Sequence, residues 1–257
     1  MTGGRPRAGT EIAVHPDAEV LASAVAARLV TRLIDIQAAG RVPHVVLTGG
    51  GVGIDLLRKL RDLPAQRAVD WSRVEVFWGD ERFVPPGDRE RNDEQAREAL
   101  LDHVGVDPDR VHPMGADGGS GPSGAEQAAA EYATLLGRLA TGQVPVPRFD
   151  VVLLGMGGEG HTLSVFPDSP AAHDEEHTVV AVHGCPKPPP DRVSLTLPML
   201  AHADEAWVVA SGAAKADAVA GAVGGAPETQ LPVAGARRAG TTRWLLDREA
   251  AAQLPQG

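Results

Sequence analysis

The pattern of apolar residues predicts a long amphipathic helix near the start of the chain. After the Pro16-Asp17 pair, apolar side chains recur at helical spacing and fall on one face. They are Val20, Leu21, Val25, Leu29, Leu33 and Ile36. A short apolar run at 44–47, the glycines at 49–51 and a second helical pattern at 54–60 follow. This order predicts a strand, a tight glycine turn and a helix.

Strand and helix patterns continue to alternate along the rest of the chain. Apolar or alternating runs predict further strands at 74–78, 149–154, 179–182, 193–197, 206–210 and around Trp244. Helical patterns are expected at 92–103, after the capping-box pair Ser123 and Glu126, and from Ala213. This alternation predicts a single α/β domain over 1–257, built on a mainly parallel sheet flanked by helices, with residues 1–10 flexible.

The functional residues are expected in four loops. In open sheets of this kind, ligands bind beyond the carboxyl ends of the strands. The loops that follow predicted strands lie at 48–53, 79–92, 155–162 and 183–192.

The composition narrows the class of ligand. The chain has 24 basic and 34 acidic side chains, a formal net charge of −10 and a hydrophobic fraction of 43%. This is the composition of an ordinary globular protein, and its acidic excess argues against nucleic acid or an anionic membrane as a partner. The single Cys185 excludes an internal disulfide, and no apolar run approaches the roughly 18 residues of a membrane span. A cytoplasmic monomer that acts on a small molecule is expected.

One familiar motif in the third loop is rejected. Gly155, Gly157 and Gly160 match the dinucleotide pattern G-x-G-x-x-G after a strand. That pattern needs a helix to receive the pyrophosphate, and Pro167 and Pro170 leave no room for one. A nicotinamide cofactor is therefore not expected.

A second motif is rejected as well. Residues 173–177 match H-x-x-E-H, which binds zinc in some proteases. The segment is short and polar and has no obvious third ligand, so a solvated loop or helix end is expected. No metal is required.

The segment 155–162 surrounds one histidine with glycines. These glycines, which include Gly157 and Gly160, allow the backbone to approach a ligand closely. Glu159 lies two residues before His161, where a carboxylate can fix the imidazole tautomer and raise its basicity. A histidine that only caps the following turn is the alternative. Its place among glycines at the carboxyl end of a strand favours a general base.

Arg82 is the first of three candidate anion-binding cations. It follows the predicted strand 74–78, so it lies at the same edge of the sheet as the histidine loop. Its guanidinium can bind a phosphate or a carboxylate through two N–H groups. A salt bridge to Asp80 or Glu81 within its own loop is the alternative interpretation.

Two further cations and a glycine turn complete the set. Lys187 lies in a loop stiffened by prolines, which reduces the entropy lost when it holds a ligand, although a solvated lysine is the plainer interpretation. Arg192 begins the next strand. Gly49, Gly50 and Gly51 open a helix and can present free N–H groups to an anion, or serve only as a tight turn. Together these residues favour a small phosphorylated substrate that undergoes water attack or proton transfer.

Three stretches of the chain resemble the 6-phosphogluconolactonase family. They are VEVFWGDERFVPP, with Asn92 shortly beyond it, FDVVLLGMGGEGHTLSVFP, and CPKPPPDRVSLTLPML; weaker similarities are VVLTGGG, WVVASGAAKADAV and TRWLLD. The resemblance implies a Rossmann-like α/β fold, similar to that of glucosamine-6-phosphate deaminases. It implies hydrolysis of 6-phospho-D-glucono-1,5-lactone to 6-phosphogluconate in the pentose phosphate pathway, without a metal or an organic cofactor.

The same resemblance assigns residues to the reaction. His161 matches the family's general base, and Glu159 stands where many members have aspartate. Arg82 and Lys187 match residues that bind and polarise the substrate, so these four are the expected catalytic residues. The expected substrate-binding residues are Gly49, Gly50, Gly51, Asp80, Asn92, Gly157, Gly160 and Arg192.

The chain departs from the family's pattern in its glycine loop, and other functions stay open. The family's loop usually continues with serine, threonine and proline, whereas this chain has glycine and valine at 51–53, so backbone N–H groups must supply the contact to phosphate. A glucosamine-6-phosphate deaminase carries an acidic residue in a GHI-x-F-NEP-like continuation after the histidine, which Thr162 to Pro167 lack. A sugar-phosphate sensor without catalysis is the non-enzymatic alternative.

Overall fold

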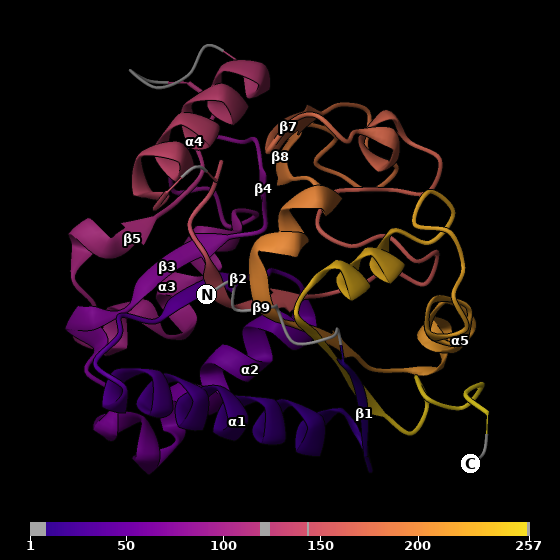
Figure 1. The fold of residues 1–257 in the computed structure, drawn as a ribbon, viewed down its shortest axis with the longest axis horizontal. Coiled ribbons are helices and arrows are strands. Elements are labelled where there is room, and N and C mark those ends of the chain that lie inside the picture. Colours follow the sequence, from indigo (N-terminus) through magenta and orange to yellow (C-terminus); the bar gives the residue numbers. More distant parts are fainter. Residues whose placement is uncertain (1–8, 119–123, 143, 256–257) are drawn as a thin grey trace, which may run out of the picture.

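The computed structural model describes residues 9–118, 124–142 and 144–255, and this part of the chain forms a large and a small sheet (Figure 1). The large sheet is parallel throughout, with strand order β1-β10-β9-β6-β2-β3-β5. Its strands are β1 (Gly9–His15), β2 (His44–Leu47), β3 (Glu75–Trp78), β5 (Val111–His112), β6 (Phe149–Leu154), β9 (Ala203–Ala210) and β10 (Thr241–Asp247). From β2 onward this is the 3-2-1-4-5-6 order of doubly wound sheets, which confirms the predicted Rossmann-like fold.

The strand order reverses at the centre of the large sheet. There β2 and β6 are neighbours, with Val45 paired with Val151 and Val46 paired with Val152. The chain moves outward from β2 through β3 to β5, and from β6 through β9 to β10. The loops that leave β2 and β6 therefore diverge, and such a point is where doubly wound sheets open a crevice for ligands.

A second, three-stranded sheet was not predicted. It consists of β4 (Asp80–Arg82), β8 (Arg192–Leu195) and β7 (Val179–Val182), paired antiparallel in that order. Residues 80–82, expected in a loop, are charged and carry no strand pattern of their own. They become extended because β8 offers a partner, with Arg82 opposite Arg192 and Asp80 opposite Ser194.

The helices agree with the apolar patterns in type, and their ends differ by a few residues. The α-helices are α1 (Ala18–Ala38), α2 (Gly51–Asp62), α3 (Asn92–Ala99), α4 (Ala125–Leu139) and α5 (Ala216–Val223). The shorter 3-10 helices are η1 (Pro64–Ala68), η2 (Trp71–Arg73), η3 (Leu101–His103), η4 (Pro108–Arg110), η5 (Pro170–His173), η6 (Leu197–His202), η7 (Ala213–Lys215) and η8 (Pro232–Arg238). Asp17 caps α1 by accepting a hydrogen bond from Val20 N at 2.8 Å. The expected cap Ser123 lies outside the described residues.

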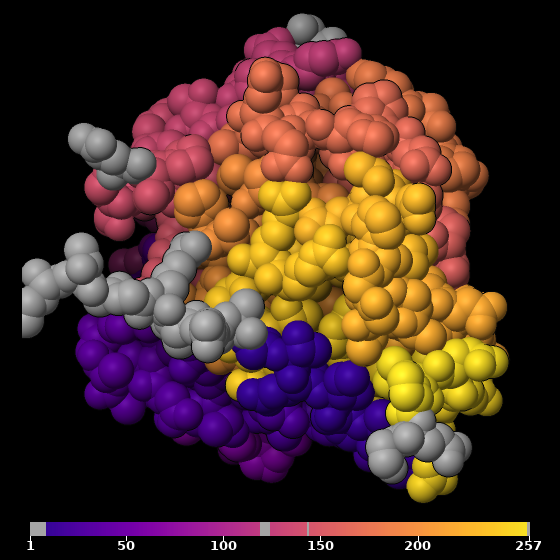
Figure 2. All heavy atoms as spheres, turned by 45° about the vertical axis from the view of Figure 1, so that its right-hand side comes forward, coloured from indigo at the N-terminus to yellow at the C-terminus, as the bar shows by residue number. Residues whose placement is uncertain are grey.

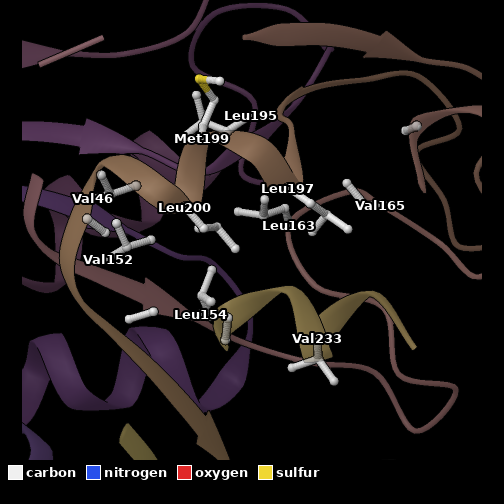
Figure 3. Packing of buried hydrophobic residues seen from close by; sticks show 14 of the residues in the cluster. Val46, Val152, Leu154, Leu163, Val165, Leu195, Leu197, Met199, Leu200 and Val233 are labelled. Carbon is white, nitrogen blue, oxygen red and sulfur yellow. The ribbon is translucent and has the colours of Figure 1, made fainter. Parts of the chain in front are cut away.

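The large sheet separates two hydrophobic clusters. Because side chains alternate along a strand, Val151 and Leu153 of β6 join the cluster under α1 and α2, while Val152 and Leu154 join the other. Figure 3 shows this second cluster, to which Val152 of β6 and Leu200 of η6 both belong. Burial on both faces explains why 149–154 is apolar at every position except Asp150.

The first strand, β1, extends the sheet at its edge. It runs parallel to β10 from Gly9 opposite Thr241 to His15 opposite Asp247. Figure 2 shows this segment, in indigo, on the surface beside the yellow C-terminal part. Residues 9 and 10, expected to be flexible, are thus part of a strand, while 1–8 lie outside the described residues. Among the described residues, no helix combines the length and the hydropathy needed to cross a membrane.

Tyr132 of α4 ties the helix to the large sheet and supports a first prediction. Its hydroxyl accepts a hydrogen bond from Trp78 N and donates one to His112 O, each at 3.2 Å, in a buried environment. We expect Tyr132→Phe to lower the free energy of unfolding by about 1–3 kcal/mol, because buried backbone groups lose their partner. Urea denaturation measures this, and an unchanged midpoint would show that the hydroxyl contributes nothing.

Candidate active site

A cavity of about 320 Å³ lies where the strand order reverses. It is bounded by the loops after β2, β6 and β9, together with parts of β4, α3 and β8. Its lining is formed by Thr48, Gly49, Gly50, Gly51, Val52, Gly53, Asp80, Arg82, Asn92, Gly155, Met156, His161, Leu163, Val209, Ala210, Ser211, Arg192 and Lys215. The site therefore occupies the crevice expected for a doubly wound sheet.

The glycine turn after β2 forms one wall and leads into α2. Gly50 has a φ of 81° and is followed by Gly51, the first residue of the helix, which has no side-chain cap. Its first N–H groups are therefore available to an anion, assisted by the positive end of the helix dipole. Gly49 also has to be glycine, because a Cβ there would lie 1.9 Å from Asn92 Oδ1. The predicted nest thus lines the cavity.

His161 and Glu159 form the predicted pair. His161 Nδ1 lies 2.7 Å from Glu159 Oε1, so the longer glutamate side chain reaches the ring. The imidazole also stacks on Phe166, with ring centroids 4.5 Å apart. Its side chain is 18% exposed and lines the cavity, so the ring bridges Glu159 and the ligand space.

The electrostatic environment keeps this pair in the state that a general base needs. Burial lowers the pKa of His161, and the hydrogen bond and charge of Glu159 oppose that shift. Burial raises the pKa of Glu159, but hydrogen bonds from Lys187, from its own backbone and from His161 outweigh it and bring the pKa to about 2. At neutral pH Glu159 is a carboxylate that accepts the Nδ1 proton of a neutral imidazole, which leaves Nε2 as the free base.

The glycines of the histidine loop make room for this pair. A Cβ on Gly157 would lie 2.2 Å from both Glu159 Oε2 and His161 Nδ1. Gly160 has a φ of 89° and packs against Leu231. Neither glycine is part of the cavity lining, so the two residues expected to bind substrate instead shape the loop.

Arg82 and Asn92 carry unsatisfied polar atoms at the cavity. Arg82 donates to Glu90 O through one terminal nitrogen and, among the residues that the structure describes, forms no salt bridge to Asp80 or Glu81, which was the alternative interpretation. Arg82 Nε and Asn92 Oδ1 are buried and have no hydrogen-bond partner within the described residues. Buried polar atoms without partners are costly, and a polar ligand in the cavity can satisfy both.

Asp80 and Arg192 are held by hydrogen bonds and face each other at the cavity. Asp80 Oδ2 accepts from Ser164 Oγ at 2.6 Å and lies 4.0 Å from Arg192 Nη1. Arg192 donates to the carbonyl groups of Lys187 and Pro189 at 3.0 Å each. Both residues are largely buried, and Arg192 fixes the proline loop in addition to lining the site.

Glu81 connects two elements that contribute residues to the cavity. It is fully buried and accepts hydrogen bonds from the backbone N–H groups of Arg82, Asn92 and Asp93, two of which begin α3. Burial raises the pKa of Glu81 to about 8, against the opposing charge of Arg91. Glu81 thus joins β4 to the start of α3 and places Asn92 at the ligand space.

Lys215 is a functional candidate that the sequence interpretation missed. It lies in η7, after β9, and lines the cavity together with Ser211. Burial lowers the pKa of Lys215, and the charge of Lys187 lowers it further. The available signal was the stretch SGAAK directly after an apolar strand, but the loop after β9 was not among the four searched.

The two rejected motifs have structural roles in the described part of the chain. After Gly160 the chain turns, and the next helical segment is the short η5, so no helix is present to receive a pyrophosphate. His177 Nδ1 lies 2.8 Å from Asp174 Oδ2 in an exposed loop. Among the described residues, no group of three or more histidine, cysteine, aspartate or glutamate side chains is arranged to hold a metal ion.

Comparisons with known proteins are consistent with this geometry. The sequence model described as glucosamine-6-phosphate isomerases/6-phosphogluconolactonase matches residues 16–244. The chain is 52% identical over 251 residues to the 6-phosphogluconolactonase of Streptomyces coelicolor, covering 96% of this chain and 95% of that protein. It is 48% identical over 246 residues to the 6-phosphogluconolactonase of Mycobacterium tuberculosis, covering 96% and 99% respectively.

Solved structures show the same fold. A 6-phosphogluconolactonase from Trypanosoma brucei superposes with a TM-score of 0.80 at 28% identity, covering 96% of this chain and 99% of that one. A monomeric glucosamine-6-phosphate deaminase gives a TM-score of 0.77 at 19% identity, covering 95% and 99%. At that identity the second likeness concerns the fold alone.

Proposed function

The chain belongs to the family of glucosamine-6-phosphate isomerases and 6-phosphogluconolactonases, and we propose that it hydrolyses 6-phospho-D-glucono-1,5-lactone to 6-phosphogluconate, a step of the pentose phosphate pathway. The observation that carries the proposal is the Glu159–His161 pair at a cavity with an uncapped helix N-terminus and Lys215. A base and an anion site that line the same cavity suit a phosphorylated lactone.

The phosphate binds at the glycine turn. The free N–H groups at the start of α2 and the ammonium group of Lys215 supply hydrogen bonds and positive charge there. This arrangement compensates for the absence of hydroxyl side chains at 51–53. The lactone ring then extends toward His161, with Arg82 and Asn92 beside it.

Hydrolysis begins when Nε2 of neutral His161 takes a proton from a water molecule. The water oxygen forms a bond to C1 of the lactone, and the negative charge that develops on the carbonyl oxygen is stabilised by the Arg82 guanidinium. Glu159 holds the imidazolium through its Nδ1 proton. The bond from C1 to the ring oxygen then breaks, and His161 returns its proton to that oxygen, which becomes a hydroxyl group. The product acid releases its proton to solvent.

The deaminase alternative requires an acidic residue just after the histidine. In this chain the corresponding residues have structural roles. Thr162 Oγ1 donates to Gly155 O at 2.8 Å, while Leu163 and Phe166 belong to a hydrophobic cluster. No carboxylate stands in 162–167 to assist opening and isomerisation of an amino sugar. The intact Glu159–His161 pair likewise favours an enzyme over a sensor without catalysis.

A side-by-side assay tests the proposed function. Freshly prepared 6-phosphogluconolactone and glucosamine 6-phosphate are supplied separately to the purified protein, and acid release and ammonia release are followed. We expect lactone hydrolysis far above the spontaneous rate and no ammonia release. Lactone hydrolysis at the spontaneous rate would overturn the proposal, and ammonia release would support the deaminase.

The phosphate site supports a second prediction. We expect Lys215→Ala to raise KM for the lactone roughly 10- to 150-fold, because a hydrogen bond to a charged group contributes about 1.5–3 kcal/mol. Steady-state kinetics measure the change, and kcat should vary much less. Lys59→Ala is the matched control, since Lys59 pairs with Glu19 on the surface. An equal effect of both variants on KM would contradict the assignment.

A further inference from the structure

Lys187 contacts the catalytic pair directly. Its Nζ lies 2.8 Å from Glu159 Oε1, the same oxygen that His161 Nδ1 contacts at 2.7 Å. Lys187 Nζ and His161 Nδ1 are 3.5 Å apart. Since the Nδ1 proton is directed to Glu159, the lysine and the imidazole are two donors on one acceptor oxygen. The ammonium group thus lies beside the ring without bonding to it.

Lys187 lies beside the cavity lining, next to His161. The cavity lining includes Lys215, Arg82 and Arg192, but Lys187 is not part of it. Half of the Lys187 side chain is exposed, and its charged end is directed to Glu159. Its expected role in binding and polarising the substrate stays a prediction, whereas its contact with Glu159 is observed.

The backbone that carries Lys187 is held in place from inside the protein. Arg192 is largely buried and donates to Lys187 O and Pro189 O at 3.0 Å. At the ends of the loop, Cys185 N donates to Pro190 O at 2.9 Å. A loop anchored in this way lowers the entropy cost of holding a long, flexible side chain in one position.

We propose that Lys187 is a positioning residue that acts on His161 through Glu159. It does two things. Its hydrogen bond fixes the Glu159 carboxylate in the place where it accepts the Nδ1 proton, which directs Nε2 to the cavity. Its positive charge disfavours a second positive charge on the adjacent ring. The imidazole therefore stays neutral and able to accept a proton at lower pH than it otherwise would.

Several charged groups surround the ring, and their signs are consistent with this role. Glu159 and Asp80 raise the pKa of His161, while burial and Lys187 lower it. The other charged groups at the cavity are Arg82, Arg192 and Lys215. Lys187 is the cation that contacts Glu159, the carboxylate partner of the base. Its removal should therefore raise the pKa of His161 for two reasons. The ring loses a neighbouring positive charge, and Glu159 then interacts with the imidazole without competition from the lysine.

The test compares Lys187→Met with Lys187→Arg, which keeps the charge. Histidine NMR titration of the substrate-free protein follows the His161 resonance, identified by its absence in His161→Asn. We expect His161 to titrate at higher pH in Lys187→Met than in the wild-type protein, and Lys187→Arg to remain near the wild type. Lys59→Met, which removes a surface charge, should cause no shift.

Kinetics supply the second readout, which rests on the proposed lactonase function. In Lys187→Met the acid limb of kcat/KM should move by roughly one pH unit to higher pH, a typical effect of a charge within about 4–6 Å. KM should rise far less than in Lys215→Ala. An unchanged His161 titration, or a large rise in KM with an unmoved acid limb, would overturn the proposal. If the lactone is not a substrate at all, the NMR titration still decides the role of Lys187.

Discussion

Replacing His161 by alanine is expected to lower kcat for lactone hydrolysis by about 10²–10⁴-fold and to leave KM nearly unchanged. In the proposed mechanism the imidazole is the base, and its Nδ1 lies 2.7 Å from Glu159 Oε1. The proposed phosphate site at the glycine turn and Lys215 does not include the ring. In this variant kcat should therefore fall while KM stays close to the wild-type value.

Steady-state kinetics and a pH profile measure this effect together. Because burial lowers the pKa of His161, the acid limb of kcat/KM in the wild-type enzyme should lie at lower pH than the value of about 6.5 that is ordinary for histidine. Activity should then decrease as the pH falls through the folded-state pKa and the base becomes protonated. His177→Ala, in an exposed loop, serves as the control. Turnover close to wild type in His161→Ala would remove the base from this mechanism.

Gly157→Ala is expected to be almost as damaging, although it changes one hydrogen into a methyl group. The added Cβ would lie 2.2 Å from Glu159 Oε2 and from His161 Nδ1, which real Cβ contacts do not allow. The two side chains must move apart, and misplacement of reacting groups by about 1 Å can cost 10²-fold in rate. We expect a loss of roughly that size in kcat.

A matched variant separates this effect from a general effect on stability. Gly105→Ala adds the same methyl group where nothing lies within 4 Å and the backbone is not left-handed. It should keep wild-type kinetics. Circular dichroism and urea unfolding should show both variants folded, because the displaced atoms in Gly157→Ala are the ends of side chains. Normal turnover by Gly157→Ala would mean that the contact between Glu159 and His161 is dispensable.

The sequence was most informative where burial dictates the pattern. The stretch 149–154 is apolar at nearly every position because β6 is covered on both faces, and this identified a central parallel strand. The glycine-flanked His161 lies in the loop that directly follows this strand. Once strands and helices alternate, the position of ligands at the carboxyl ends follows from the topology. The loops after β2, β3 and β6 were therefore found without knowledge of the structure.

Features that depend on long-range partners could not be predicted in this way. Residues 80–82 become a strand only because β8 lies beside them, and β1 is held by its pairing with β10. Lys215 and the glycine turn line the same cavity because β9 and β2 end at the same edge of the sheet, on either side of β6. The orientation of Lys187 toward Glu159 depends on Arg192, whose contacts no local pattern reveals.

The most direct test of the central claim is a crystal structure of the protein with the stable product, 6-phosphogluconate. The account predicts its phosphate at the N-terminus of α2, within hydrogen-bond distance of Lys215, and its carboxylate beside His161 Nε2 and Arg82. It also predicts that Lys187 remains on Glu159. A phosphate bound at Lys187, or a ligand outside the cavity between β2 and β6, would contradict the account.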